Sequence, residues 1–265
     1  EEFSEAAGKL LTNFFTDSRS RMAPHLEYAQ AIPGRCSGRG IGIIDTLHLI
    51  DLAPAVSLVD SRRGLDTLQR ERLDDWFAGY LDWLLTSEKG LREMGEGNNH
   101  AVAWAVQVAA FGRLTGHQPA LELCGDLYRR VFLGEQMAPD GSFPRELKRT
   151  RPYNYSLFVI DNLVTLAHLL SNEKQNLWEL QLPDGRSIRR GLNFIYPYVE
   201  QKGRWPFGRD VVGFDLLPVA MPFMLLAARA LGDPRWERLW RRLPQEPTDP
   251  EIRRNRAIKE PRLYL

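Results

Sequence analysis

Apolar side chains recur every three or four positions along most of this chain, the spacing that gathers them on one face of an α-helix. The clearest case is Leu65–Leu85, where leucines and aromatic residues alternate with charged residues. We predict an amphipathic helix there, with its apolar face against a core. The same pattern predicts helices at 5–15, 101–114, 120–132, 157–170, 187–199, 214–231 and 233–240. The segment 157–170 is apolar on most faces, which indicates an inner helix.

Glycine and proline interrupt the helical pattern at two places. Residues 30–45 contain Pro33 and several glycines, which predicts a long ordered loop. A short strand near Ile41–Ile44 is the main strand signal. Pro218 and Pro222 fall within 214–231 and are expected to bend or delay that helix, because proline has no N–H to donate.

The order of these elements predicts an all-α protein. Helical hairpins joined by polar, glycine-rich loops are typical of an α/α toroid, here an incomplete barrel of hairpins over residues 1–242. Residues 243–265 are rich in proline, arginine and glutamate. We expect them to form an extended C-terminal tail.

Composition places the chain among ordinary globular proteins and excludes little else. Hydrophobic residues make up 43% and charged residues 26%, and the formal net charge is +1. This charge predicts no general attraction to nucleic acid or to an anionic membrane. No signal peptide or uninterrupted membrane-length apolar run is recognised. Cys36 and Cys124 are expected to be free thiols, with a disulfide as the alternative.

Two segments concentrate proton-handling groups at the start of an apolar helix. The first is Gly97–His100, and the second runs from Arg145 to Phe158. Together they supply amide, imidazole, guanidinium and phenol groups, but no obvious pair of carboxylates. This set favours proton abstraction beside a carboxylate carried by the substrate over hydrolysis.

These segments belong to an ordered series of short motifs that resembles the alginate lyase superfamily, polysaccharide lyases acting on alginate and glucuronan. The series is Tyr28–Gly34, Gly38–Thr46 with His48, Asn98–His100, Pro139–Ser142, Arg145–Arg149 and Tyr155–Phe158. It covers roughly 10–207. The resemblance implies an α/α toroid that cleaves an anionic, uronate-containing polysaccharide by β-elimination, without an organic cofactor. It also implies a periplasmic or extracellular location.

The resemblance also implies roles for individual residues. Asn99 would hold the substrate carboxylate, with Arg149 assisting its neutralisation. His100 would be the base or a positioning group, and Tyr155 the acid, or both acid and base. The spacing from Arg149 to Tyr155 is one residue shorter than in classical alginate lyases, so Tyr153 is a rival for the catalytic phenol.

Further residues are expected to contact substrate. Arg39 lies between glycines that let the backbone approach a substrate carboxylate. Asn98 and Tyr153 flank the catalytic candidates. His48 is either substrate-facing or a helix-start histidine. Trp205 either stacks on a sugar ring or packs in the core.

Two other functions remain open from the residues. A toroid glycoside hydrolase would need a pair of carboxylates. The available candidates are Asp45, Asp140, Asp161 and Asp215, and the sequence shows no convincing catalytic pair among them. A non-catalytic glycan-binding protein is favoured by residues 101–105, which replace the Gly-Thr-Trp-Tyr-Asp run of the family. That Asp would be a partner of the imidazole. No metal is predicted, because Asp45, His48 and His100 match no ligand motif.

Overall fold

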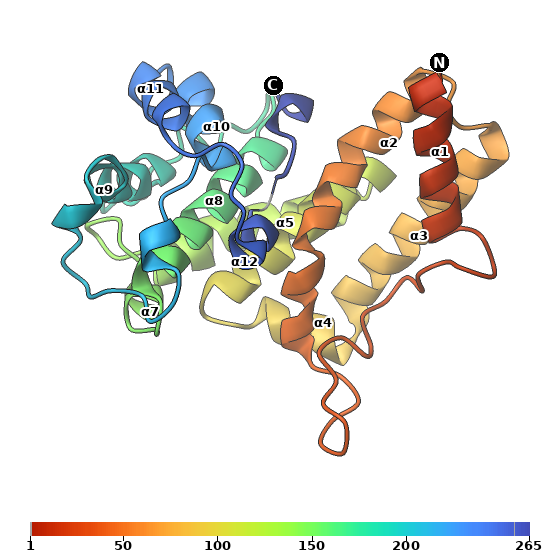
Figure 1. Ribbon diagram of the computed structural model, residues 1–265, viewed down its shortest axis with the longest axis horizontal. Helices are drawn as coiled ribbons and strands as arrows, with labels where there is room; N and C mark the ends of the chain where they lie inside the picture. Colours follow the sequence, from red (N-terminus) through yellow and green to blue (C-terminus); the bar gives the residue numbers. More distant parts are fainter. Residues whose placement is uncertain (1, 257) are drawn as a thin grey trace.

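The computed structural model describes residues 2–256 and 258–265 and is built from helices (Figure 1). Over these residues the only β-type pairings are two isolated bridges, Ile32–Cys36 and Asn172–Gln175. Neighbouring helices pack as hairpins that form an incomplete α/α toroid, which confirms the predicted fold class. Cys36 and Cys124 are free thiols.

The larger elements follow in chain order. The α-helices are α1 (Glu2–Phe15), α2 (Leu52–Ser61), α3 (Thr67–Thr86), α4 (Glu88–Met94), α5 (Asn99–Thr115), α6 (Gln118–Leu127), α7 (Pro144–Leu147), α8 (Pro152–Leu170), α9 (Ile188–Glu200), α10 (Pro222–Leu231), α11 (Pro234–Arg242) and α12 (Pro250–Asn255). The 3-10 and π segments are η1 (Gly40–Asp51), η2 (Tyr128–Gln136), η3 (Lys202–Arg204), η4 (Phe214–Leu216) and η5 (Pro261–Leu263).

Helices α5 and α8 form the centre of the molecule. Every residue of α5 from Ala101 to Gly112 is buried, and so are most residues of α8. A helix that is apolar on all sides must be surrounded by other elements. The prediction of an inner helix at 157–170 is therefore confirmed. The first turns of α5 and α8 carry the polar residues singled out above, so this packing decides where those residues meet.

The segment η1 differs from its prediction. Residues 40–51 form a 3-10 helix that leads directly into α2, so the predicted strand at Ile41–Ile44 and the second half of the predicted loop are wrong. Ile43, Leu47 and Ile50 are buried at a helical spacing of four and three residues. The glycines in this region serve close packing, since a Cβ on Gly42 would lie 2.5 Å from the Ala29 side chain.

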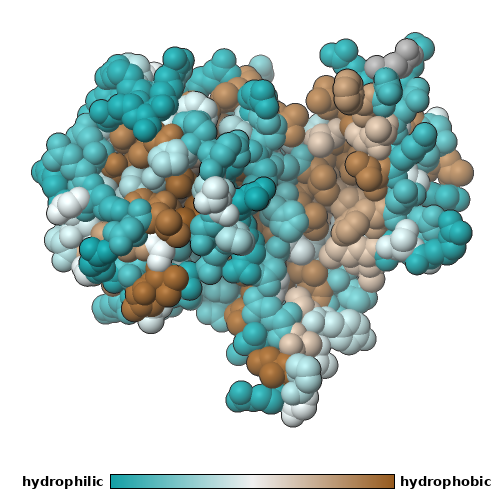
Figure 2. Space-filling view, viewed as in Figure 1, coloured by the Kyte–Doolittle hydropathy of each residue, from teal (hydrophilic) through white to brown (hydrophobic). Residues whose placement is uncertain are grey.

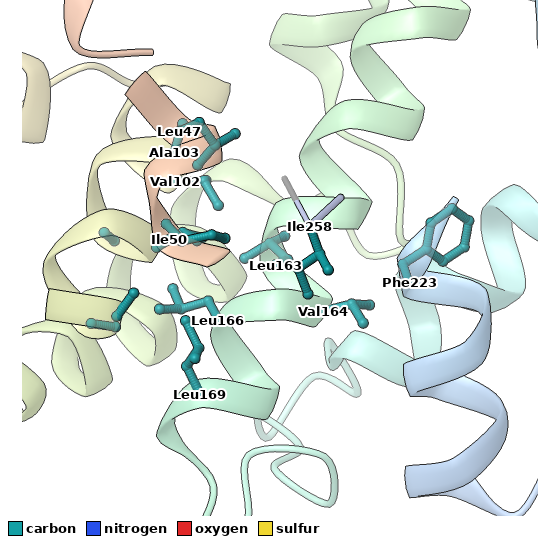
Figure 3. Packing of buried hydrophobic residues seen from close by; sticks show 14 of the residues in the cluster. Leu47, Ile50, Val102, Ala103, Leu163, Val164, Leu166, Leu169, Phe223 and Ile258 are labelled. Atoms are coloured by element: carbon teal, nitrogen blue, oxygen red, sulfur yellow. The ribbon is translucent and has the colours of Figure 1, made fainter. Parts of the chain in front are cut away.

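The stretch Gly40–Ser61 is the one helical stretch of the described chain with the length and composition to cross a membrane. Leu47 and Ile50 pack beside Val102 and Ala103 of α5 (Figure 3). Contacts within the protein bury 39% of the most apolar window of this stretch. On the face shown in Figure 2, apolar side chains gather over α2, while polar side chains cover most of the remaining surface.

Proline delays α10 as predicted. Residues 214–216 form the short 3-10 turn η4, and α10 begins only at Pro222, which occupies its first position. Four α-helices, α2, α4, α7 and α12, lie outside the predicted set. The second of these is important, because α4 places an acidic side chain next to the candidate site.

The C-terminal segment folds back onto the centre of the molecule. Residues 243–265 include α12 and η5, and Ile252 and Ile258 are almost entirely buried. Figure 3 shows Ile258 beside Leu163 of α8. The hydroxyl of Tyr264 donates to the carbonyl of Ile50 at 3.1 Å. These contacts hold α12 in front of α5 and α8 (Figure 1).

Candidate active site

A cavity of about 230 Å³ lies where the first turns of α5 and α8 meet η1 and α12. All four predicted catalytic residues line it, namely Asn99, His100, Arg149 and Tyr155. The other lining residues are Gln30, Ile41, Ile44, Asp45, Asn154, Phe158, Glu251, Arg254 and Asn255. Two segments about fifty positions apart in the sequence are thus brought to one place.

A buried carboxylate positions Asn99. Glu146 is 1% exposed and accepts hydrogen bonds from the backbone N–H of Asn99 at 2.7 Å and from its side-chain Nδ2 at 2.6 Å. Together these two bonds orient the amide. The Oδ1 atom of Asn99 is buried without a hydrogen-bond partner in the described part of the chain. This unused atom is an acceptor, so the donor that remains on the amide is the second hydrogen of Nδ2.

Arg149 connects this carboxylate to the phenol of Tyr155. Its Nη1 lies 3.5 Å from Oε2 of Glu146, and its guanidinium carbon lies 3.7 Å from the centre of the Tyr155 ring. Nη1 is buried and makes no hydrogen bond to the described residues. A buried guanidinium nitrogen without a hydrogen-bond acceptor is suited to an incoming carboxylate.

Burial raises the pKa of Glu146 above its ordinary value of 4.5. The hydrogen bonds from Asn99 and the charge of Arg149 act in the opposite direction and offset part of this rise. Burial and the contacts with Asn99 and Arg149 therefore shift the pKa of Glu146 in opposite directions.

A second buried carboxylate holds His100. Nδ1 of the imidazole lies 2.6 Å from Oε1 of Glu93, which comes from α4 and is 1% exposed. With Nδ1 engaged by the carboxylate, the neutral ring presents an unprotonated Nε2 to other groups. Glu93 thus provides the imidazole with the acidic partner that residues 101–105 lack.

Asn98 caps α5. Its Oδ1 accepts the backbone N–H of His100 at 2.9 Å, and Asn98 is not among the cavity-lining residues. Capping of α5 therefore explains the presence of an asparagine at position 98.

Tyr153 and Trp205, expected to contact substrate, lie in an aromatic cluster instead. Tyr153 is fully buried, and its hydroxyl donates to the carbonyl of Tyr198 at 2.9 Å. Its ring packs against Trp205, whose Nε1 donates to the carbonyl of Gly208 at 2.8 Å. In this placement both side chains contact other parts of the protein, and neither lines the cavity. For Trp205 the structure selects the core-packing alternative.

Arg39 lies beside the site and contacts Gln30, which lines the cavity. Its guanidinium donates to the backbone and side-chain oxygens of Gln30 at 3.0 Å, and Gln30 Nε2 donates to Asp45 Oδ2 at 2.7 Å. Arg39 lines an adjacent cavity of about 470 Å³, and Ile41 lines both cavities. Arg39 is thus placed along an extension of the site.

His48 is exposed and lies outside the cavity. Partial burial of its ring and the charge of Lys259 lower its pKa. The expected substrate-facing role is not supported by this position.

Sequence patterns did not single out several residues of the site. Glu146 stands in a run of basic residues, and Glu93 stands in a short helix with no apolar stripe to mark it as buried. No local signal could have linked Glu251, Arg254 and Asn255 to residues 150 positions away. Their participation depends on the path of the C-terminal segment.

The carboxylates considered for hydrolysis do not gather at one point. Of the four, only Asp45 lines the cavity. Asp140 accepts the backbone N–H of Ser142, Asp161 accepts that of Phe223, and Asp215 pairs with Arg209. In the described residues, no group of three or more His, Cys, Asp or Glu side chains is placed to hold a metal ion.

The sequence matches the family model described as Alginate lyase over residues 1–205. Among solved structures, an alginate lyase from Bacteroides ovatus is 25% identical, with a TM-score of 0.79; the match covers 98% of this chain and 69% of that one. Alginate lyase A1-III from Sphingomonas species A1 is 17% identical, with a TM-score of 0.53; that match covers 87% of this chain and 60% of that one. No curated protein matches significantly.

Proposed function

The chain belongs to the alginate lyase family, and from this premise we propose that it is a polysaccharide lyase that cleaves alginate by β-elimination in the cavity between α5 and α8. The Bacteroides ovatus neighbour, described as an alginate lyase, supports this choice of substrate. Glucuronan is the second candidate, because its sugar also carries a carboxylate at C5.

One observation carries the proposal. The amide of Asn99, the imidazole of His100, the guanidinium of Arg149 and the phenol of Tyr155 line one cavity. The buried carboxylates of Glu146 and Glu93 form hydrogen bonds with Asn99 and His100, respectively. This is the set of groups that elimination beside a carboxylate requires.

Neutralisation of the substrate carboxylate comes first. The proton at C5 of a uronate is only weakly acidic while the neighbouring carboxylate retains its full charge. We assign Arg149 and Asn99 to this carboxylate, because Arg149 Nη1 is buried without a hydrogen-bond partner and the Asn99 amide is oriented by Glu146. Donors aimed at the charge that develops during proton removal lower the barrier.

Proton transfer follows from the same arrangement. His100 Nε2 takes the C5 proton, and the electrons of the broken C5–H bond form the C4=C5 double bond. The C4–O4 bond breaks, and O4 takes a proton from the hydroxyl of Tyr155. His100 returns its proton to Tyr155 through solvent before the next cycle. If Tyr155 serves as both base and acid, His100 is a positioning group instead.

The first experiment follows ultraviolet absorbance of the 4,5-unsaturated uronate end on alginate, polymannuronate and glucuronan. Tyr155→Phe is expected to reduce kcat by about 10²- to 10⁴-fold, the usual contribution of a general acid or base, while polysaccharide binding persists. Tyr153→Phe is the matched control, because it removes the same hydroxyl from a buried residue outside the cavity. It should retain activity wherever it remains folded.

Other outcomes would contradict the proposal in distinct ways. Full activity of Tyr155→Phe together with loss in Tyr153→Phe would reverse the assignment of the phenol. New reducing ends without ultraviolet absorbance would indicate a hydrolase. Polysaccharide binding with neither signal would indicate a non-catalytic glycan-binding protein.

A periplasmic or extracellular location is proposed on family membership alone, and fractionation of cells that express the protein with its native start tests it.

A further inference from the structure

One wall of the cavity comes from the far end of the chain. Glu251, Arg254 and Asn255 of α12 line it together with Asn99 and Arg149. Figure 1 shows α12 lying in front of α5 and α8, about 100 residues later in the sequence than α8. The cavity is therefore completed by a segment that the catalytic motifs do not include.

Several contacts hold α12 in this position. Asp249 caps its start by accepting the backbone N–H groups of Glu251 and Ile252 at 3.0 Å. Ile252 is 7% exposed and anchors the helix to the core. At its end, the ammonium group of Lys259 donates to the carbonyls of Arg254 at 3.0 Å and Arg256 at 2.5 Å. A fixed helix presents its side chains to the cavity in a defined way.

Of the two arginines on α12, Arg254 is the one that lines the cavity. Glu251 forms an ion pair with Arg151, so its charge is balanced. Arg254 has only a loose partner, since its Nη1 lies 3.6 Å from Oδ1 of Asp45 and its side chain is 55% exposed. That separation is too long for a hydrogen bond. Among the described residues, the Arg254 side chain makes no hydrogen bond, so its donors are free for a ligand.

We propose that Arg254 binds the carboxylate of the uronate next to the one being cleaved, and so selects for a polyuronate chain. A polyuronate carries one carboxylate on each sugar, whereas Asn99 and Arg149 can neutralise only the reacting one. Arg254 supplies a second guanidinium to the same cavity from a different helix, and this group can bind the next carboxylate along the polysaccharide. This inference rests on the proposed function, because it takes the substrate to be a polyuronate.

A substitution of Asp45 distinguishes substrate binding by Arg254 from a purely structural ion pair between Arg254 and Asp45. If Arg254 serves only to pair with Asp45, removing either partner should have the same effect. If Arg254 binds substrate, Asp45 competes with the substrate carboxylate for the guanidinium. Asp45→Asn should then strengthen binding of a polyuronate, whereas Arg254→Ala should weaken it.

The test compares Arg254→Ala with Arg253→Ala. Arg253 is the matched control, because it is exposed, stands on the same helix, carries the same charge and does not line the cavity. We expect Arg254→Ala to raise KM for alginate about five- to twentyfold with a smaller effect on kcat, as for one partly exposed charge-assisted contact. Arg254→Lys should recover part of the loss, and Arg253→Ala should resemble the wild type.

Binding is also measured by titrating oligouronates of defined length into Tyr155→Phe protein with and without Arg254→Ala. This readout needs no turnover, so it judges Arg254 even if the wild type releases no unsaturated ends and the proposed function fails. Equal Kd values for the Arg254→Ala and Arg253→Ala variants would overturn the inference. It would also be overturned if Asp45→Asn weakened binding as much as Arg254→Ala, or if the wild type bound no polyuronate.

Discussion

Removing the carboxylate of Glu146 tests whether this buried group, which orients Asn99, supports both stability and catalysis. In Glu146→Ala, the backbone N–H of Asn99 and its side-chain Nδ2 both lose their acceptor in a buried place. Arg149 loses the carboxylate that lies 3.5 Å from its Nη1. The change therefore affects the orientation of the amide and the balance of charge beneath the cavity.

The magnitude follows from those contacts. A hydrogen bond to a charged group contributes about 1.5–3 kcal/mol, and an orphaned buried donor carries a similar penalty. Two such bonds are lost, so Glu146→Ala should lower the free energy of unfolding by about 3–6 kcal/mol. Glu146→Gln retains one acceptor but turns an amide N–H toward a donor of Asn99, and should cost about 1–3 kcal/mol.

The pH dependence has a defined sign. Because burial raises the folded-state pKa of Glu146 above 4.5, the native state holds its proton more tightly than the unfolded chain does. The stability contributed by this raised pKa is fully present below about pH 4.5 and is lost as the pH rises through the folded pKa. Glu146→Gln has no such titration, so its stability relative to the wild type should improve over that interval.

Urea unfolding at a series of pH values measures this effect, and ultraviolet assays on the same proteins measure kcat. We expect kcat of Glu146→Gln to fall about ten- to hundredfold, on the scale of a misplaced oxyanion donor or less. Glu179→Gln is the control, since this carboxylate is exposed and, within residues 2–256 and 258–265, pairs with Arg189 alone. Unchanged stability and activity in Glu146→Ala would refute the reasoning. A difference that widened with pH would show that the Asn99 donors outweigh burial.

Two further changes test neighbouring contacts. Glu93→Gln should lower kcat on alginate about ten- to hundredfold with little change in KM, as for an outer partner that orients a functional imidazole; steady-state kinetics would contradict this if kcat were unaffected. Ile258→Ala removes a fully buried side chain that lies beside Leu163, and should lower the free energy of unfolding by about 2–5 kcal/mol; denaturant unfolding would contradict it if the midpoint stayed within error of the wild type.

The sequence predicted the helices whose apolar faces are regular and long. Leu65–Leu85 corresponds to α3, and 157–170 lies within α8, which begins earlier, at Pro152. Pro222 marks the start of α10, in line with the expected delay. The loop prediction failed at 40–45, where glycine suggested an irregular chain and the structure has the first half of the 3-10 helix η1. Glycine there permits the close approach of the backbone to Ala29, a reason that local pattern does not reveal.

Two of the expected substrate contacts show how burial overrides residue type. Tyr153 and Tyr155 are two positions apart on α8, so their side chains point to different sides of the helix. One faces the aromatic cluster around Trp205 and the other faces the cavity. Sequence spacing alone could not decide which phenol meets the substrate, because that depends on how α8 is rotated against its neighbours.

The chain by itself determined the all-α architecture and the chemical types at the site, because helical periodicity and short motifs are local properties. Only the tertiary structure decided the partners of those groups. Glu146 reaches Asn99 across 47 positions, Glu93 enters from a separate helix, and α12 returns from the end of the chain to complete the cavity. These contacts depend on how apolar faces pack together, and packing joins residues that no local pattern in the sequence connects.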